Sequence, residues 1–349
     1  MQARRLLLAP VILLTAAVSA CSINVSAERH TATEKKSFTV TGTPDVVLKT
    51  FDGAIEVTTW DRPEVAVTIE RYAGSQAEAE ELEVKAVQDG DTITVEAIRP
   101  ERTVQVGFHV GRGVKLVATL PKQANLEART GDGAISAKGV DGRVELNTGD
   151  GAISGADQSG DLAVHTGGGS VALDGVSGRV TVNTGDGSVR VRGAPRVLRA
   201  TTGDGSINLD LASGTVLEED WLVTTGDGSI RASLPAALSA EIDARTGDGR
   251  ISADELGLTT SDSRRELRGT LGAGGRQLKL RTGDGSISLS KGEKRARRKP
   301  SGPAGRPRRT PAGAPGTCCR RRNAAAGGRP RRPLPARAVA PPRAPCTRA

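Results

Sequence analysis

The chain has 349 residues, and its formal charge of +9 is distributed very unevenly. Residues 291–349 hold 18 Lys or Arg against one acid, a charge of +17, so residues 1–290 carry −8. The excess of basic residues therefore lies in the tail, residues 291–349, and not in the body, residues 1–290. The four cysteines are Cys21, Cys318, Cys319 and Cys346, so residues 22–317 offer neither a disulfide framework nor a thiolate metal site.

The first 21 residues have the pattern of a bacterial lipoprotein signal. Arg4–Ala17 gives a basic start and an apolar stretch too short to span a bilayer, and Val18–Cys21 reads as a lipobox. Resemblance to such signals implies that residues 1–20 are removed and that Cys21 carries a lipid. It also implies the cell envelope, and the outer membrane if the bacterium is Gram-negative, because Ser22 follows the cysteine. A plain cleaved signal with an incidental cysteine is the alternative.

Residues 21–37 are polar and without periodicity, which indicates a tether. From residue 38 to 120, short apolar alternations predict an irregular set of strands. These are Phe38–Val40, Val46–Leu48, Ile55–Val57, Val65–Ile69, Thr92–Val95 and Val114–Leu120. Ser75–Glu83 is rich in Ala and Glu, which predicts about two turns of helix. No linker interrupts residues 38–290, so we expect one continuous domain; a separate β domain at 38–120 is the alternative.

Residues 121–290 repeat the phrase Thr-Gly-Asp-Gly-small-Ile/Val, and Thr50–Ile55 looks like a degenerate early copy. The first five copies start every 18 residues, and three more follow after steps of 23, 21 and 36. The copies start at Thr130, Thr148, Thr166, Thr184, Thr202, Thr225, Thr246 and Thr282. A fixed period of this size indicates a stacked repeat, in which each unit buries its apolar side against its neighbours.

Each 18-residue unit contains two short alternating stretches, such as Ala134–Ala137 and Arg143–Asn147, which predict two strands. Equivalent strands should stack in parallel about 4.8 Å apart. The sequence thus predicts an all-β fold, a single-chain, β-helix-like solenoid with residues 38–120 as an irregular N-terminal cap. The Gly-Asp-Gly corners supply residues that tolerate positive φ, so the chain can bend between strands. The longer steps after Thr202 and Thr246 predict corner loops, with Ser261–Arg268 projecting from the body.

One aspartate stands in every copy of the repeat except the third, where Gly168 replaces it. The aspartates are Asp132, Asp150, Asp186, Asp204, Asp227, Asp248 and Asp284. Coils stacked in register would bring neighbouring carboxylates about 5 Å apart, where they repel one another. The side chains could cap their own turn amides, bind Ca²⁺ between coils, or lie out of register in the later copies. We favour the turn-forming role; calcium is the one cofactor that the pattern suggests.

No catalytic constellation is recognisable. His30, His109 and His165 are scattered, which suits neither a metal site nor a catalytic triad. A glycan lyase or hydrolase would suit a β-helix, but it needs clustered acid and base groups in a cleft. The outward positions are Thr, Ser, Asn, Arg and Glu without such a cluster. We therefore expect no enzyme, and a glycan-active enzyme is the least favoured alternative.

Residues 291–349 are dense in Pro, Gly, Ala and Arg and have almost no apolar residue for a core, which predicts disorder. Our first interpretation is a non-native tail from a misassigned reading frame. An arm that binds the envelope comes second. Nucleic-acid binding is the least favoured, because a basic tail without aromatic residues fits poorly on an exported protein.

Several segments together resemble a bacterial family, the DUF4097 type of putative adhesins. They are Phe38-x-Val40, Gly53–Val57 followed by Trp60-Asp61, and Leu120-Pro121 leading into the TGDGxI coils. The resemblance covers about residues 38–290 and implies a cell-envelope β-solenoid, without any family active site to carry over.

We therefore expect a non-catalytic, lipid-anchored envelope protein that acts as an adhesin or a structural scaffold. Its expected partners are the membrane, through the lipid on Cys21, and an envelope protein or glycan surface. A calcium-dependent binding module built on the aspartate column is the alternative.

Overall fold

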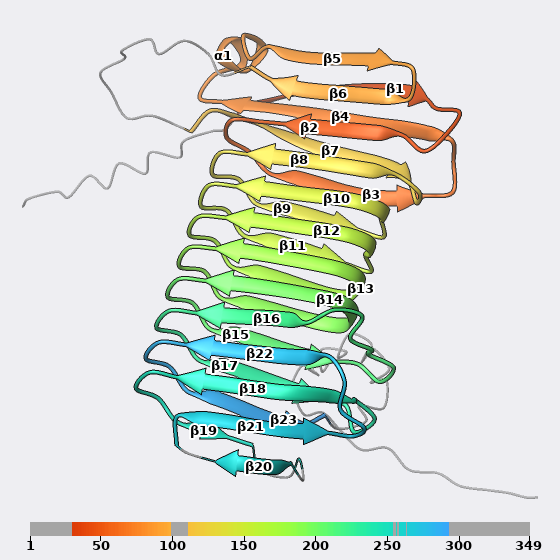
Figure 1. Ribbon diagram of the computed structural model, residues 1–349. Coiled ribbons are helices and arrows are strands. Elements are labelled where there is room, and N and C mark those ends of the chain that lie inside the picture. The colour runs from red at the N-terminus through yellow and green to blue at the C-terminus, as the bar shows by residue number, and fades with distance from the viewer. Residues whose placement is uncertain (1–29, 99–110, 254–255, 257, 263, 293–349) are drawn as a thin grey trace, which may run out of the picture. The chain divides into compact units, whose positions relative to one another are not determined.

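The computed structural model describes residues 30–98, 111–253, 256, 258–262 and 264–292 of the chain. Cys21, the signal segment, His109 and the tail from residue 293 lie outside the described residues. The described part is almost entirely β-strand, and the predicted all-β solenoid is confirmed (Figure 1).

The N-terminal part contains seven strands and the one helix of the described residues. They are β1 (His30–Thr39), β2 (Asp45–Lys49), β3 (Ile55–Trp60), β4 (Glu64–Ala73), α1 (Gln76–Glu80), β5 (Val84–Asp89), β6 (Thr92–Ala97) and β7 (Gly113–Pro121). The helix lies where the Ala/Glu-rich segment predicted it. Its N-cap is Ser75, whose hydroxyl accepts a hydrogen bond of 3.2 Å from the amide of Glu78.

The repeats supply the remaining strands. They are β8 (Asn125–Thr130), β9 (Ile135–Lys138), β10 (Asp141–Thr148), β11 (Ile153–Ala156), β12 (Ser159–Thr166), β13 (Val171–Thr184), β14 (Val189–Thr202), β15 (Ile207–Leu211), β16 (Trp221–Thr225), β17 (Ile230–Leu234), β18 (Ala240–Thr246), β19 (Ile251–Ser252), β20 (Thr259–Asp262), β21 (Glu266–Leu271), β22 (Gln277–Thr282) and β23 (Ile287–Lys291).

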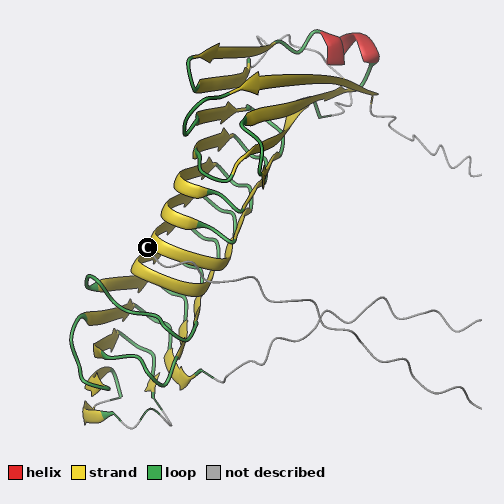
Figure 2. Ribbon diagram, turned by 90° about the vertical axis from the view of Figure 1, so that its right-hand side faces the viewer, coloured by secondary structure: helices red, strands yellow, loops and turns green. Residues whose placement is uncertain are grey.

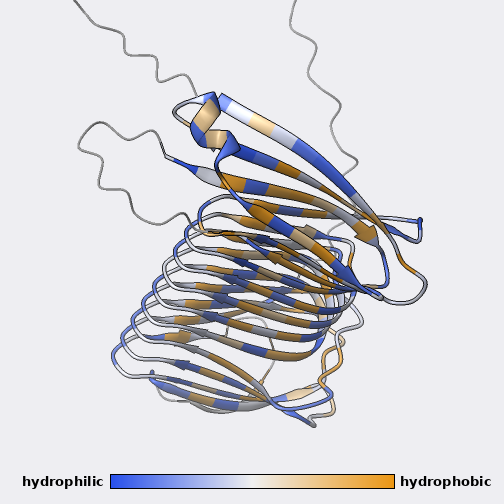
Figure 3. Cartoon of the chain, turned by 90° about the horizontal axis from the view of Figure 1, so that it is seen from above, coloured by the Kyte–Doolittle hydropathy of each residue, from blue (hydrophilic) through white to orange (hydrophobic). Residues whose placement is uncertain are grey.

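Each coil contributes one strand to each of two faces. The first face holds β6 and the strands that end at or just before a corner threonine, in the order β6, β2, β8, β10, β12, β13, β14, β16, β22 and β18. The second face holds the strands that follow the corner, in the order β7, β3, β9, β11, β13, β14, β15, β17, β23 and β19. The long strands β13 and β14 run across both faces. Side and end views show the coils stacked one upon another (Figures 2 and 3).

The core lies between the two faces. Ile135, Ile153 and Val171 stack directly on one another in the second face, and Val144 and Leu162 do so in the first. All five are at most 3 % exposed. Apolar and polar residues alternate along the strands in Figure 3, so the period-2 pattern of the sequence marks which side chains point inward.

The order of the coils in space differs from their order in the chain. The coil of Thr282 lies between those of Thr225 and Thr246, because β22 pairs with both β16 and β18, and β23 with both β17 and β19. Likewise the early coil β2–β3 lies between β6–β7 and β8–β9. The N-terminal part therefore shares both faces with the repeats, and Thr50–Ile55 is a true corner of the stack.

Two details of the sequence-based prediction are wrong. Residues 30–37 are not tether but belong to β1, which needs only one backbone partner, β4, and can therefore be polar. Ser261–Arg268 does not project as a loop, because β20 and β21 form an antiparallel hairpin that pairs with β18. Positive φ occurs at the opposite corner, for example 97° at Gly160 and 89° at Gly178, and not at the glycines of the TGDG phrases.

Candidate functional site

The corner of the TGDG phrases is the feature that the sequence singled out. All eight corner threonines occupy equivalent places in the stack, so the later copies lie in register despite their irregular spacing. Five aspartates lie on consecutive coils, in the spatial order Asp186, Asp204, Asp227, Asp284 and Asp248. Asp132 and Asp150 lie on consecutive coils on the other side of Gly168. All seven side chains belong to exposed residues.

The aspartates do not cap the corner amides; the threonines do. The corner threonines are buried, between 0 and 8 % exposed. Thr166 is typical: its hydroxyl donates to the carbonyl of Gly151 on the preceding coil, at 3.1 Å, and accepts from the amide of Gly169, at 3.1 Å. Within the described residues, Asp248 is the only one of the seven aspartates whose side chain has a partner, an ion pair of 3.4 Å with Arg265.

The second glycine of each phrase is needed for close stacking. A Cβ on Gly169 would overlap the backbone carbonyl of Gly151, and the same overlap recurs at Gly151 and Gly187 against the coil before each. Glycine thus lets successive corners approach within contact distance, with the backbone carbonyl of one coil over the Cα of the next. Sequence reasoning missed this role and that of the threonines, although both residues recur in every regular copy.

No metal centre is assembled in the described part of the chain: no group of three or more His, Cys, Asp or Glu is arranged to hold an ion. The corner aspartates form a single file, so each carboxylate has neighbours only on the coils before and after it. Calcium binding by the aspartate column remains a prediction. His165 lies exposed between Asn147 and Asn183 in an outward column of the first face, as expected.

The second face presents small side chains over its regular coils. Ala152 and Ser170 are exposed on successive coils, and Ser154 pairs with Ala172 across the β11–β13 ladder. With their neighbours they line a shallow hollow of about 200 Å³. Between β9 and β13 this face therefore presents mostly small, uncharged side chains.

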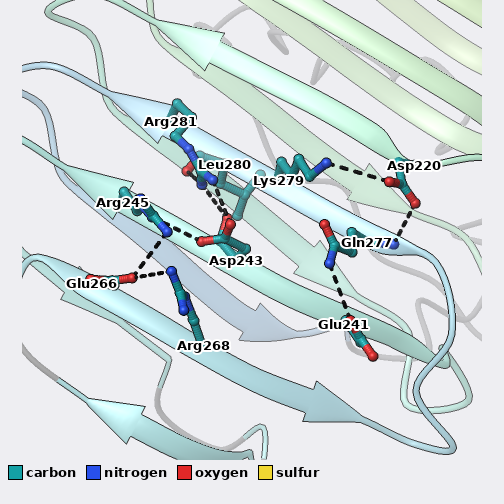
Figure 4. Close-up of polar contacts among 10 residues, drawn as sticks. All are labelled: Asp220, Glu241, Asp243, Arg245, Glu266, Arg268, Gln277, Lys279, Leu280 and Arg281. Atoms are coloured by element: carbon teal, nitrogen blue, oxygen red, sulfur yellow. Dashed lines mark hydrogen bonds and ion pairs between the residues drawn. The ribbon is translucent and has the colours of Figure 1, made fainter.

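The first face is charged toward its C-terminal end, where a polar network surrounds the intercalated strand β22 (Figure 4). Arg281 of β22 donates to the carboxylate of Asp243 on β18, at 2.6 Å, and to its backbone carbonyl, at 2.6 Å. On the other side, Asp220 accepts from the amide of Gln277 at 3.1 Å and pairs with Lys279 at 3.5 Å. Asp243 on one side and Asp220 on the other therefore both bind residues of β22.

These contacts lower the pKa values of both acids, Asp243 and Asp220. Burial raises the pKa of Asp243, but the hydrogen bond and charge of Arg281, with Arg245, outweigh it and hold the pKa below the ordinary 3.8. The backbone amide of Gln277 is the main cause that lowers the pKa of Asp220, with Lys279 assisting. Both carboxyls are therefore held in their charged form at neutral pH.

The fold defines a β-solenoid of two-stranded coils joined by Thr-Gly-Asp-Gly corners. A family model described as Toastrack DUF4097 matches residues 44–290, more than half of the chain, so the chain belongs to this family. The resemblance noted in the sequence is confirmed. No curated protein matches the chain. Among the described residues, no helix has the length and apolar character needed to cross a membrane.

Three solved structures are similar to the chain at low identity. A "putative cell adhesion protein" from Clostridium sporogenes shares 12 % identity over 75 % of this chain and 100 % of that one, with a TM-score of 0.26. A "putative adhesin" from Bacteroides fragilis shares 11 % over 74 % and 97 %, with a TM-score of 0.35. A "putative adhesin" from Parabacteroides merdae shares 14 % over 74 % and 96 %, with a TM-score of 0.40.

Proposed function

We propose that the protein is a non-catalytic, lipid-anchored component of the cell envelope whose solenoid offers a stiff adhesive or structural surface. The observation that carries the proposal is the in-register display of the same small side chains on successive coils of the second face, as at Ser170 and Ser188. Solenoids commonly use such extended, repeating surfaces for binding. We assign the contact to the stretch of the second face between β9 and β13 because small, uncharged side chains dominate it. Ion pairs run over the first face and also flank this stretch, as in Lys115–Glu56 and Arg192–Asp174.

The contact surface can be tested with the purified chain from Ser22 immobilised on a plate and exposed to bacterial envelope fragments. We expect Ser170→Arg/Ser188→Arg to reduce binding about tenfold, because long charged side chains prevent close contact at the centre of an interface. Thr181→Arg/Thr201→Arg, on the first face, is the matched control. Equal losses in both variants, or a loss only in the control, would contradict a contact through the second face.

The lipid anchor rests on the signal pattern that ends at Cys21. In a bacterial host we expect the full-length chain to sediment with membranes and to incorporate a labelled fatty acid. Cys21→Ser should abolish the label and release the protein from the membrane fraction. An unlabelled wild-type chain, or a variant that sediments equally, would argue against lipidation.

A calcium-dependent binding module is the second candidate, and the register of the aspartate column favours it. Asp204 and Asp227 lie on consecutive coils, so one cation could bridge them. Millimolar Ca²⁺ should then raise the thermal midpoint relative to EDTA, and Asp204→Asn/Asp227→Asn should remove the rise. Asp161→Asn, away from the corner, is the control. Identical unfolding curves with Ca²⁺ and EDTA would leave the aspartates without a metal role.

A glycan-active enzyme is the remaining alternative. It predicts new reducing ends when the protein is incubated with bacterial polysaccharides, and loss of that turnover on substitution of one outward Asp or Glu. The proposed non-catalytic role predicts no turnover.

A further inference from the structure

The N-terminal part contains an open hollow of about 500 Å³ formed by three connecting segments. They are Val40–Thr43 between β1 and β2, Trp60–Pro63 from the end of β3 toward β4, and Pro121–Gln123 from the end of β7 toward β8. The volume is in the range that small ligands occupy in proteins. The strands between these segments are fixed in the stack, so the hollow exists without a ligand.

Backbone contacts hold the three segments together. The amide of Val40 donates to the carbonyl of Pro63 at 3.1 Å, and Trp60 is directly opposite Pro121 in the β3–β7 ladder. The amide of Thr41 donates to the carboxylate of Asp91 at 2.8 Å, which fixes the β1–β2 connection. The walls of the hollow are thus pre-organised, which lowers the entropic cost of binding.

An aromatic ring and an arginine occur together in the wall. Trp60 is partly exposed, and its ring is held in place because the indole Nε1 donates to the carbonyl of Glu64 at 2.7 Å. The guanidinium of Arg62 lies 5.0 Å from the centre of that ring. A guanidinium stacked on an aromatic ring keeps its edge free for a carboxylate, to which it can donate two hydrogen bonds.

The lining has a net positive charge although the body as a whole is acidic. Arg62 and Lys122 are the cations, and Asp61 is the one acid among the lining residues. Asp61 pairs with Lys122 at 2.8 Å, with side chains 84 % and 60 % exposed, so the pair contributes little and the carboxylate of a ligand can compete for Lys122. Asp61 would then be free to accept hydrogen bonds from hydroxyl groups.

We propose that this hollow binds an acidic saccharide, a short segment of a glycan that contains uronic acid residues. Trp60 would contact the apolar face of a sugar ring, Arg62 and Lys122 its carboxylate, and Asp61 its hydroxyls. The inference rests on the proposed adhesive function and names one chemical class of its target. The saccharide contact would lie apart from the proposed adhesive surface on the second face, where the N-terminal part meets the regular coils.

The test is a calorimetric titration of the chain from Ser22 with trigalacturonate and, as the uncharged match, its methyl ester. We expect saturable binding of the acid and binding at least tenfold weaker for the ester, since a lost charge-assisted pair costs about 1.4 kcal/mol or more. Trp60 fluorescence gives a second readout, because the only other tryptophan, Trp221, is fully buried.

Arg62→Gln and Lys122→Gln should each weaken trigalacturonate binding about tenfold, and Arg143→Gln, an exposed arginine elsewhere, should not. Trp60→Phe should weaken it too, with a thermal scan to check its folding. The inference is overturned if trigalacturonate does not bind, if the ester binds equally well, or if the Arg62 and Lys122 variants bind like the wild type. Adhesion to envelope fragments, measured separately, shows whether the proposed function fails as well.

Discussion

At the scale of single residues, the corner depends on the hydroxyl of the threonine and on the absence of a Cβ at the second glycine. The sequence pattern alone does not show that these two residues matter more than the aspartate. The threonine hydroxyl satisfies one carbonyl and one amide in a buried place, where an unmade hydrogen bond costs about 1–3 kcal/mol. The missing Cβ of the second glycine lets the next backbone approach. The side chain of the aspartate between them is exposed.

Two adjacent glycines in the third corner provide a direct comparison. Gly169→Ala should destabilise the protein by about 1–3 kcal/mol or more, because the new methyl overlaps the backbone of Gly151, which cannot move without disturbing two coils. Gly168→Ala should be nearly neutral, since its nearest neighbour, at 3.1 Å, is the end of the exposed Asp150 side chain. Urea unfolding measures both. Equal effects would mean that backbone conformation and not close approach selects the second glycine.

Gln158 is the one residue in the described core whose polar side-chain atoms are buried without a hydrogen-bond partner. It is 2 % exposed and stands in the repeat position of Val140 and Val176. Gln158→Val should therefore stabilise the protein by about 1–3 kcal/mol, because it removes an unpaired buried amide. Val176→Gln, as the reverse change, should destabilise it. An unchanged or lowered urea midpoint for Gln158→Val would show that the amide is satisfied in solution.

At the scale of elements, the intercalated strand β22 is held by carboxylates on both neighbouring strands. Since the pKa of Asp243 is lowered from 3.8 in the folded state, its contribution to stability is present in full above its unfolded pKa. It is lost as the pH falls through the lower, folded pKa. The loss of stability at acid pH therefore depends in part on the contacts of this strand.

We expect Asp243→Asn to lower the thermal midpoint at pH 7, and to lower it progressively less as the pH falls through the lowered pKa of the wild-type carboxyl. Thermal scans of both proteins from pH 7 to pH 2 measure the difference. Asp161→Asn, exposed on β12, is the matched control and should show no such convergence. Parallel profiles for wild type and Asp243→Asn would mean that Arg281 is held by the backbone carbonyl alone.

The sequence predicts the strands and coils well because period, alternation and burial all derive from one repeated unit. It cannot predict the order of the last two coils, because the phrases at Thr246 and Thr282 are alike and either could stack on the coil of Thr225. The deciding element is the hairpin β20–β21, which pairs with the free edge of β18 and makes that coil terminal. The hollow at Trp60 could not be predicted from the sequence either, because its three segments lie far apart in the chain.

At the scale of the whole body, residues 30–292, the intercalated coil joins the end of the stack to the rest. Without β22 and β23, the coil of Thr246 would lose its parallel partner on both faces, and the coil of Thr225 would keep only β14 and β15. The backbone hydrogen bonds that β22 and β23 make to these two coils would be lost. Two open edges would remain, and such edges are prone to pair with other chains. The final coil is thus a structural requirement although it follows all the others in the chain.

A pair of truncations tests this requirement. A chain that ends at Gly275 should unfold in more than one step, with the segment of β18–β21 melting first, and should associate through its exposed edges. A chain that ends at Gly292 keeps every described strand, so we expect it to unfold in one step, with the same midpoint as the full chain. Thermal scans and light scattering measure both. If the shorter truncation melted like the longer one, the coil of Thr246 would have to dock directly on that of Thr225, in chain order. In that case the polar network of Arg281 would contribute little, and the hairpin alone would close the stack.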